Sequence, residues 1–283
     1  MSDFNTLSSQ VALAHRPADI ARQATLTYFR DPSQQVSAKQ GEMLGSAHFD
    51  PVTEADRGAE AKIRHVIETE CPEFGLIGEE LGALRPQADL RWIVDPIDGT
   101  RSYICGLPTW TTLVGLASEN ESILGVVDQP FTGERWLGSK NGAYWMRRYE
   151  PSNANDLQKI QCRPCASIEE ACIATTDPRP GALFSVEQAR GFDDLARRAR
   201  VVRFSTDAYG YVLVASGNLD LVIESGLHLY DIAAIIPLIE AAGGLITDWQ
   251  GCTIKMNGDW NGTVVAAGDV RIHREALDAI ATW

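Results

Sequence analysis

Two aspartates stand close together in the segment 92–100 (WIVDPIDGT), at the end of an apolar run. Pro96 and Gly99 favour a tight turn here, and such a turn brings Asp98 back toward Asp95. Two carboxylates held this close repel each other unless a cation lies between them, and oxygen ligands of this kind suit Mg²⁺ or Mn²⁺. The alternative is an ordinary polar turn in which an aspartate caps a helix. We predict a Mg²⁺ site at this turn, at which Mn²⁺ could replace Mg²⁺.

Three other acidic segments stand where strands end or helices begin. Glu79 follows a short apolar run in GLIGEE, Asp56 lies in TEAD, and Asp231 starts a long apolar run. Each has a plain structural explanation. Adjacent glutamates are usually just solvated, Thr53 and Asp56 fit an N-terminal capping box, and Asp231 could be a helix N-cap. These acids can do chemistry only if the fold brings them together.

The spacing of apolar residues predicts the elements that must position these acids. In the first half of the chain, helices are expected over 17–30 and 53–70. Strands are expected over 74–77, 91–94, 110–117, 122–128, 134–138 and 143–147. The alternation in the later segments indicates a mostly antiparallel sheet.

The segment 148–167 is polar and rich in turn residues, which makes it the best candidate for a linker. We therefore expect an N-terminal α+β lobe over 1–147, which contains most of the metal ligands, and a C-terminal α/β lobe over 148–283. In the second lobe we expect strands over 171–175, 200–204 and 219–224, two further strands, and helices over 185–199, 209–215, 231–242 and 271–282. Pro237 should bend the helix over 231–242 because proline removes a backbone hydrogen bond. This irregular alternation indicates an α+β class with layered sheets and helices.

The composition excludes several kinds of partner. The formal net charge of −13 argues against nucleic acid and anionic membranes. No apolar run approaches the roughly 20 residues of a membrane span, and the N-terminus lacks the pattern of a secretory signal, so a cytoplasmic protein is expected. Six cysteines then indicate reduced thiols, and the single CxxC, Cys162 with Cys165, lacks the second pair of a zinc ribbon. An acidic chain could still bind an anion if its carboxylates first captured divalent cations.

The acids occur in a recognisable order along the chain. Asp56 in TEAD, Glu79 in IGEE, DPIDGT at 95–100 and Asp231 in LYDIAA with a downstream EAAGG resemble the inositol-monophosphatase-like phosphatases. The resemblance runs from about Pro17 to the C-terminus. It implies a layered αβαβα sandwich with two lobes, a phosphate site in the cleft between them, and a homodimer.

The resemblance also implies a role for each residue of the motifs. Glu79, Asp95 and the carbonyl of Ile97 would bind one Mg²⁺, while Asp95, Asp98 and Asp231 would bind a second. Asp56 and Thr100 would orient the attacking water, so that Asp56, Thr100 and Glu79 form the catalytic group. The backbone amides of Gly99 and Thr100 would bind the phosphate. The expected activity is hydrolysis of a small phosphate monoester by two-metal activation of water.

Three further segments, 101–116, 206–211 and 224–237, resemble the histidinol-phosphatase branch of this family. Thr206 departs from the usual glycine of that branch, and Ser205 is also unusual. The predicted substrate-binding set is Gly99, Thr100, Ser205, Thr206, Asp207, Glu224 and Asp231. Asp207 and Glu224 could pair with the ammonium and imidazole of histidinol phosphate. Equally, Asp207 could cap a helix over 208–216.

These observations favour a histidinol-phosphate phosphatase of histidine biosynthesis. Glu224 could also accept a hydrogen bond from an inositol hydroxyl, so inositol-1-monophosphatase is the alternative. A non-catalytic metal-binding protein of the same fold is the second alternative, although the complete set of metal carboxylates argues against it. His228, in an apolar-flanked turn, is expected to be structural rather than a ligand.

Overall fold

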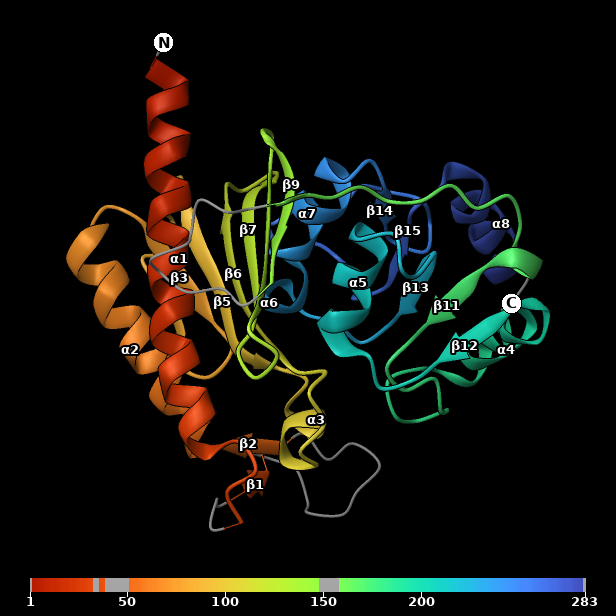
Figure 1. Cartoon of the computed structure of the whole chain (residues 1–283), viewed down its shortest axis with the longest axis horizontal. Coiled ribbons are helices and arrows are strands. Elements are labelled where there is room, and N and C mark those ends of the chain that lie inside the picture. Colours follow the sequence, from red (N-terminus) through yellow and green to blue (C-terminus); the bar gives the residue numbers. More distant parts are fainter. Residues whose placement is uncertain (1, 33–35, 39–50, 148–157, 282–283) are drawn as a thin grey trace.

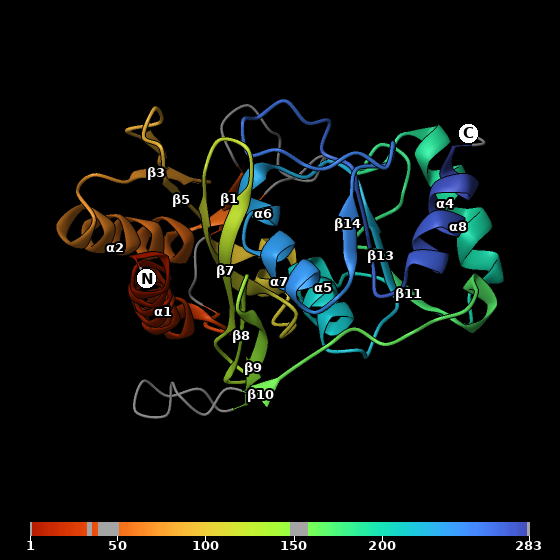
Figure 2. The ribbon, with the colours of Figure 1, turned by 90° about the horizontal axis from the view of Figure 1, so that it is seen from above.

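Five layers make up the chain in this computed structural model, which describes residues 2–32, 36–38, 51–147 and 158–281. Two helices cover one face of a large sheet, three helices fill the space between that sheet and a smaller one, and two helices cover the far face of the smaller sheet (Figure 1). The same order is seen from above in Figure 2. The predicted αβαβα sandwich is therefore confirmed.

The first layer consists of α1 (Ser2–Tyr28) and α2 (Glu54–Glu70). Helix α2 begins at the predicted capping box, in which the backbone N of Thr53 donates to Asp56 Oδ2 at 2.9 Å. Helix α1 begins well before residue 17, contrary to the sequence prediction. Pro17 lies inside this helix, which continues past the proline although Pro17 has no backbone N–H to donate.

The larger sheet has eight strands in the order β10-β9-β8-β7-β6-β5-β3-β4 and is antiparallel except where β3 pairs with β5. Its strands are β3 (Gly75–Gly78), β4 (Gly82–Leu84), β5 (Arg91–Asp98), β6 (Thr111–Ala117), β7 (Ser122–Gln129), β8 (Glu134–Ser139), β9 (Gly142–Met146) and β10 (Gln158–Lys159). The mostly antiparallel sheet was predicted, although β5 is longer than expected. Its extension carries Asp95 and Asp98. A separate two-stranded pair, β1 (Val36–Ala38) with β2 (Pro51–Thr53), precedes α2.

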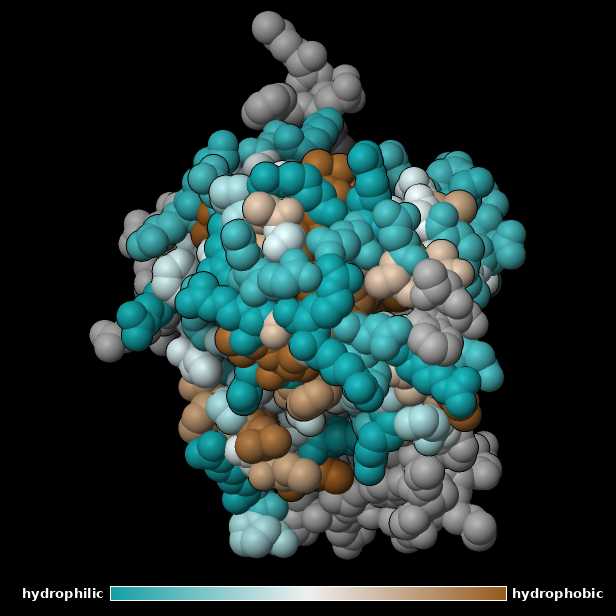
Figure 3. All heavy atoms as spheres, turned by 90° about the vertical axis from the view of Figure 1, so that its right-hand side faces the viewer, coloured by the Kyte–Doolittle hydropathy of each residue, from teal (hydrophilic) through white to brown (hydrophobic). Residues whose placement is uncertain are grey.

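The smaller sheet has five strands in the order β12-β11-β13-β15-β14. They are β11 (Cys172–Ala174), β12 (Val201–Arg203), β13 (Leu221–Glu224), β14 (Leu245–Thr247) and β15 (Val264–Ala267). The outer helices α4 (Val186–Arg198) and α8 (Val270–Ile280) cover the far face of this sheet. A short 3₁₀ helix, η2 (Ile168–Glu170), precedes β11 in the chain. The face of the molecule on this side is mainly hydrophilic, with small patches of hydrophobic side chains (Figure 3).

The middle layer contains α5 (Asp207–Ala215), α6 (Leu229–Ile232) and α7 (Ile235–Ala241). The prediction of one bent helix over 231–242 was wrong, because the chain forms two helices separated at Ala233 and Ala234. Pro237 has no N–H to donate to the Ala233 carbonyl four residues earlier. That carbonyl instead accepts a hydrogen bond from the Ser122 hydroxyl on β7.

The backbone of the turn between α6 and α7, and that of α7 itself, rests directly on a row of glycines in the larger sheet. Gly115, Gly125 and Gly138 are cross-strand partners on β6, β7 and β8. A Cβ atom at Gly115 would lie 2.8 Å from the carbonyl carbon of Ala233, and one at either of the other two would overlap the backbone of Ala234 or Leu238. The glycines are therefore required by the close approach of helix to sheet.

Both sheets contribute to a single central core. Val127 and Trp136 of the larger sheet and Val222 and Ala266 of the smaller one belong to one buried cluster around the middle helices. The predicted linker at 148–167 lies partly outside the described residues, and its later part, β10, pairs with β9. The lobe boundary at residue 147 stays a prediction.

No helix among the described residues is long and apolar enough to cross a membrane.

The cysteines in the described part of the chain are free thiols. Burial raises the pKa of the Cys162 thiol to about 11 and also raises that of Cys165. Thiols with raised pKa values are poor nucleophiles, so the CxxC does not have the character of a redox site.

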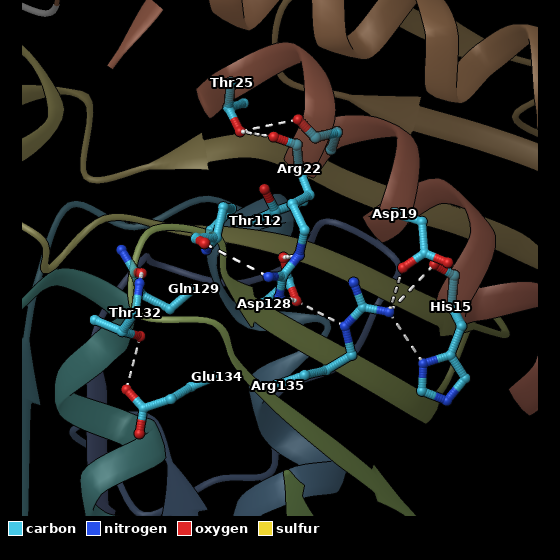
Figure 4. A network of polar contacts seen from close by, with 12 residues as sticks. His15, Asp19, Arg22, Thr25, Thr112, Asp128, Gln129, Thr132, Glu134 and Arg135 are labelled. Carbon is cyan, nitrogen blue, oxygen red and sulfur yellow. Dashed lines mark hydrogen bonds and ion pairs between the residues drawn. The ribbon is translucent and has the colours of Figure 1, made fainter. Parts of the chain in front are cut away.

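A buried charged network joins α1 to the larger sheet (Figure 4). Arg135 of β8 is fully buried and contacts Asp128 at 2.6 Å and Asp19 at 2.8 Å. Arg22 binds the two oxygens of the same Asp128 at 3.1 and 2.6 Å. The His15 Nδ1 lies 3.2 Å from Arg135 Nη1. Burial, together with this guanidinium, lowers the pKa of His15 to about 4.

The pKa of His15 predicts a pH-dependent stability. The folded value of about 4 lies below the unfolded value near 6.5, so the unfolded state binds more protons between these limits. The stabilisation that comes from keeping His15 neutral is therefore complete above about pH 6.5. As the pH falls toward 4, the free energy of unfolding decreases by a total of about 3 kcal/mol. In urea unfolding at pH 7, 6 and 5, the difference between the native protein and His15→Gln should shrink as the pH falls. A difference that stays constant over this range would contradict the assignment.

Candidate functional site

The two aspartates of the DPIDGT segment are placed by an irregularity at the end of β5. Its pairing with β6 shifts register between Asp95 and Asp98. The backbone N of Ile97 donates to Asp95 Oδ1 at 2.9 Å, and the Thr112 hydroxyl on β6 donates to the Pro96 carbonyl at 2.7 Å. The predicted turn therefore exists, and both carboxylates face the same space.

Gly99 follows this turn and adopts a left-handed conformation, with φ of +80°. A Cβ atom here would lie 2.8 Å from the carboxyl carbon of Asp207, so glycine is needed both for the conformation and for the space. Helix α3 (Thr100–Ile104) begins immediately afterwards. Gly99 thus joins the turn of Asp95 and Asp98 to the N-terminus of α3, beside the cavity described below.

Asp231 approaches the same turn from the middle layer. It lies in α6, and its Oδ2 accepts a hydrogen bond from the backbone N of His228 at 2.6 Å. Within the described residues, Asp95, Asp98 and Asp231 can each offer an oxygen such that the three lie within 4.8 Å of one another. Three of the four predicted metal carboxylates are therefore brought together, and Glu79 lines the same cavity.

The electrostatics of this group call for a cation. Burial raises the pKa of Asp95 well above its usual range, and Glu79, Asp98 and Asp231 raise it further by repulsion. Burial, with Asp207 and Asp231 nearby, likewise raises the pKa of Asp98, although the backbone N of Ala208 donates to its Oδ2 at 2.7 Å. A divalent cation would reverse these shifts, and the all-oxygen donor set fits Mg²⁺ or Mn²⁺.

Asp56 and Thr100 meet beside these clustered acids. The Thr100 hydroxyl lies 3.4 Å from Asp56 Oδ1 and 3.1 Å from the Ile97 carbonyl oxygen. Asp56 is 1% exposed, and burial raises its pKa to about 6 despite the hydrogen bonds from Thr53. The capping box and the functional interpretation are therefore both compatible with the structure. Asp56 Oδ2 accepts the hydrogen bonds from Thr53 at the helix N-terminus, and Asp56 Oδ1 faces Thr100.

A cavity of about 270 Å³ contains these groups, a size suited to a small molecule. Its lining residues come from both sheets and from the turns between them. They are Glu79, Asp95, Ile97, Asp98, Gly99, Thr100, Arg101, Thr176, Ala182, Leu183, Asp207, Glu224, Gly226, Leu227, His228, Tyr230 and Asp231.

Asp207 and Glu224, the two acids predicted to contact substrate, both line this cavity. Asp207 is the first residue of α5, with Thr206 at the N-cap position, so it does not cap the helix. Its Oδ2 accepts a hydrogen bond from the Ser102 hydroxyl at 2.5 Å, and burial raises its pKa to about 6.

Glu224 is 2% exposed at the end of β13. It accepts hydrogen bonds from the Thr176 hydroxyl and, at 2.8 Å, from the Tyr211 hydroxyl. Burial raises its pKa to about 7. Hydroxyl donors hold both Glu224 and Asp207, so side chains of the protein itself fix their orientation.

Ser205 and Thr206 are not among the described residues that line the cavity. Ser205 is exposed, and Thr206 is buried against Gly210. Arg101 and Thr176 do line the cavity, although neither was among the predicted site residues. Arg101 follows the DPIDGT motif directly, which was the signal available for it. Thr176 had none, because its place depends on the packing of the smaller sheet.

His228 and Tyr230 also line the cavity, and the expectation that His228 is structural rather than a ligand stays a prediction. Their rings stack with centroids 5.1 Å apart and an interplanar angle of 27°. The two residues stand one before and one after Leu229, and Asp231 follows. The cavity wall next to Asp231 is therefore aromatic.

Comparison with known proteins gives the same family over almost the whole chain. A model of the inositol monophosphatase family matches residues 7–282. The bifunctional phosphatase IMPL2, chloroplastic, of Arabidopsis thaliana is 37% identical over 276 residues, which are 95% of this chain and 74% of that protein. A histidinol-phosphatase of Chlorobaculum parvum is 32% identical over 89% of this chain and 91% of its own length.

A solved structure gives the same result in three dimensions. An inositol monophosphatase from Zymomonas mobilis has a TM-score of 0.81 at 35% identity, over 97% of this chain and 98% of that chain. The fold, the three clustered carboxylates and these relatives agree with one another. The chain belongs to the inositol monophosphatase family, and it is a phosphatase of that metal-dependent family.

Proposed function

We propose that this protein is a Mg²⁺-dependent histidinol-phosphate phosphatase, which would act in histidine biosynthesis. The observation that carries the proposal is the position of Asp207 and Glu224 in the same cavity as the metal carboxylates. They are a second pair of acids, beyond the four proposed as metal ligands. A phosphate ester with a cationic leaving group is the class of substrate that such a pair would select.

The charges of the lining residues support this substrate class. Four of the six acids in the cavity, Glu79, Asp95, Asp98 and Asp231, would be balanced by two divalent cations. Arg101 is the only lysine or arginine among the described lining residues. It makes an ion pair with Asp177 at 3.7 Å. A cationic leaving group would therefore enter a region where negative charge is in excess.

The aromatic wall supports an imidazole in the leaving group. His228 and Tyr230 present stacked rings on the cavity lining, and Leu183 and Leu227 add apolar surface. Planar rings pack favourably on such a wall, and a protonated imidazole gains further from the electron-rich face of a tyrosine. A cyclitol has no aromatic ring and would gain less.

Different residues of the chain would bind the cations, orient the attacking water and bind the phosphate. Glu79, Asp95, Asp98 and Asp231, with the Ile97 carbonyl, would hold the cations, which neutralise phosphate charge and favour ionisation of the attacking water when bound. The Thr100 hydroxyl, beside Asp56, would orient that water, and the backbone N–H groups of Gly99 and Thr100 would bind the phosphate. The water oxygen forms the new bond to phosphorus as the ester bond breaks, and the leaving oxygen takes up a proton.

Inositol 1-phosphate is the second candidate substrate. Glu224 is buried and accepts hydrogen bonds from hydroxyls, so it could also accept one from a cyclitol. The relatives include both a histidinol-phosphatase and an inositol monophosphatase, each above 30% identity. We further propose, on the family resemblance, that the protein is a homodimer of two-lobed subunits divided near residue 147.

The first prediction concerns the metal. Activity on phosphate monoesters should vanish in excess chelator and return with Mg²⁺. Asp95→Asn should lower kcat by about a hundredfold or more, because Asp95 is proposed to contact both cations. The same change removes a buried repulsive carboxylate, so the melting temperature of the metal-free variant should equal or exceed that of the native protein.

Two measurements check the metal prediction. Phosphate release would be assayed with and without chelator, beside Asp259→Asn, an exposed residue that serves as control. Full activity in excess chelator, or near-native turnover by Asp95→Asn, would show that the metal assignment is wrong. Absence of hydrolysis on a broad panel of monoesters would instead favour a non-catalytic protein.

The second prediction concerns substrate choice. A charge-assisted hydrogen bond contributes about 1.5–3 kcal/mol and a neutral one about 1 kcal/mol. Two charge-assisted hydrogen bonds in place of two neutral ones favour histidinol phosphate over inositol 1-phosphate by about 1–4 kcal/mol. This corresponds to a ratio of kcat/KM values from about fivefold to about a thousandfold. Glu224→Gln and Asp207→Asn should each reduce this ratio and leave hydrolysis of an aryl phosphate nearly unchanged.

The control for this experiment is Glu187→Gln, which changes an exposed acid on α4. It should leave the ratio unaltered. Equal kcat/KM values of the native protein for the two substrates would contradict the histidinol-phosphate proposal and favour the inositol alternative. An unchanged ratio in both amide variants would show that other residues select the leaving group.

A further inference from the structure

Helix α2 carries a stripe of charged residues on a face that is otherwise apolar. Asp56, Glu60 and Arg64 are spaced four residues apart and therefore lie one above another. Glu60 is 0% exposed. It is not one of the residues that line the cavity, and the roles proposed above do not use it. Burying a carboxylate this deeply is costly unless it is paired with a cation and hydrogen-bonded.

Glu60 binds the backbone on the C-terminal side of the proposed metal ligand Glu79. Its Oε2 accepts a hydrogen bond from the backbone N of Glu80 at 2.7 Å, and its Oε1 accepts one from the backbone N of Leu81 at 3.0 Å. Charge-assisted bonds from two consecutive amides fix the direction of the chain as it leaves β3.

The same carboxylate also packs on the N-terminal side of Glu79. A Cβ atom at Gly78 would overlap the Glu60 carboxyl group, so the glycine lets the two approach. Glu60 therefore touches the residue before Glu79 and binds the residue after it. The backbone of Glu79 lies between these two contacts.

Arg64 completes the arrangement one helical turn further on. Its Nε donates to Glu60 Oε1 at 2.9 Å, and its Nη2 donates to the Gly82 carbonyl. The guanidinium thus balances the charge of Glu60 and binds the far end of the same turn. Segment 78–82 is held along its length by two side chains of α2.

We propose that Glu60 is a positioning residue that sets the affinity of the metal site by fixing Glu79. The inference rests on the proposed role of Glu79 as a metal ligand. Asp56, one turn earlier on the same helix face, contacts Thr100, so α2 organises both turns that bear on the site. Groups that orient a metal ligand typically change metal affinity about ten- to a hundredfold when substituted.

The test compares Glu60→Gln with the native protein. Glutamine keeps the size of the side chain but replaces one oxygen by an N–H donor, which would face a backbone N–H. The apparent dissociation constant for Mg²⁺, measured by isothermal titration calorimetry, should rise about tenfold or more. The Mg²⁺ concentration for half-maximal activity should rise in parallel, with kcat at saturating Mg²⁺ within about threefold of native.

Glu68→Gln is the matched control, because Glu68 is an exposed glutamate on the same helix. It should leave both constants unchanged. If Glu60→Gln does not fold, Arg64→Lys provides the second variant, since it keeps the charge but cannot bind Glu60 and Gly82 together. It should raise the same dissociation constant.

The outcomes separate this inference from the proposed function. Native protein that binds no Mg²⁺ would overturn both. Mg²⁺ binding by the native protein, with unchanged affinity in folded Glu60→Gln or in Arg64→Lys, would overturn only the positioning role. A loss of thermal stability in Glu60→Gln without a change in Mg²⁺ affinity would show that Glu60 is merely structural.

Discussion

Repulsion between carboxylates is the constraint on which the rest of the structure depends. Asp95, Asp98 and Asp231 can bring oxygens within 4.8 Å of one another, and Asp95 is almost completely buried. Such a group favours the unfolded chain unless a cation joins it or protons neutralise it. The fold must therefore hold these acids together against their own charge. Packing in the rest of the molecule supplies the free energy that opposes this repulsion.

The layers share this task because the acids come from different places. Asp95 and Asp98 belong to the larger sheet, Asp231 to the middle helices, and Glu224 to the smaller sheet. No one layer contains the site. The central core, which joins both sheets around α5, α6 and α7, is consequently also what assembles the cavity. Stability and function depend on the same contacts here.

Much of this could be predicted from the sequence, because local signals and functional residues coincide. Strand ends and turn residues marked Glu79, Asp95 and Asp98, and the capping box marked Asp56, while the resemblance to the inositol-monophosphatase-like phosphatases joined them into one site. The layered class followed from the alternation of elements. These features depend on residues close together in the chain, for which turn and capping rules hold.

Other features depend on distant residues and could not be predicted in this way. The hydroxyl of Ser122 donates to the Ala233 carbonyl that Pro237 leaves free, and the chain forms two helices here instead of one bent helix. Thr176 and Tyr211 reach Glu224 only after the smaller sheet has formed. Ser205 and Thr206 follow a strand, as expected, but they are not among the described residues that line the cavity.

The glycine row of the larger sheet has a mechanical consequence. A layer of side chains between a helix and a sheet can be compressed or repacked, whereas backbone resting on backbone has little compliance. Gly115, Gly125 and Gly138 bring α7, and the turn that joins it to α6, into this second kind of contact. Asp231 is rigidly attached to the helices, and Asp95 to the sheet. The stiffness of that glycine contact therefore limits how far the acids on its two sides can drift apart during thermal motion.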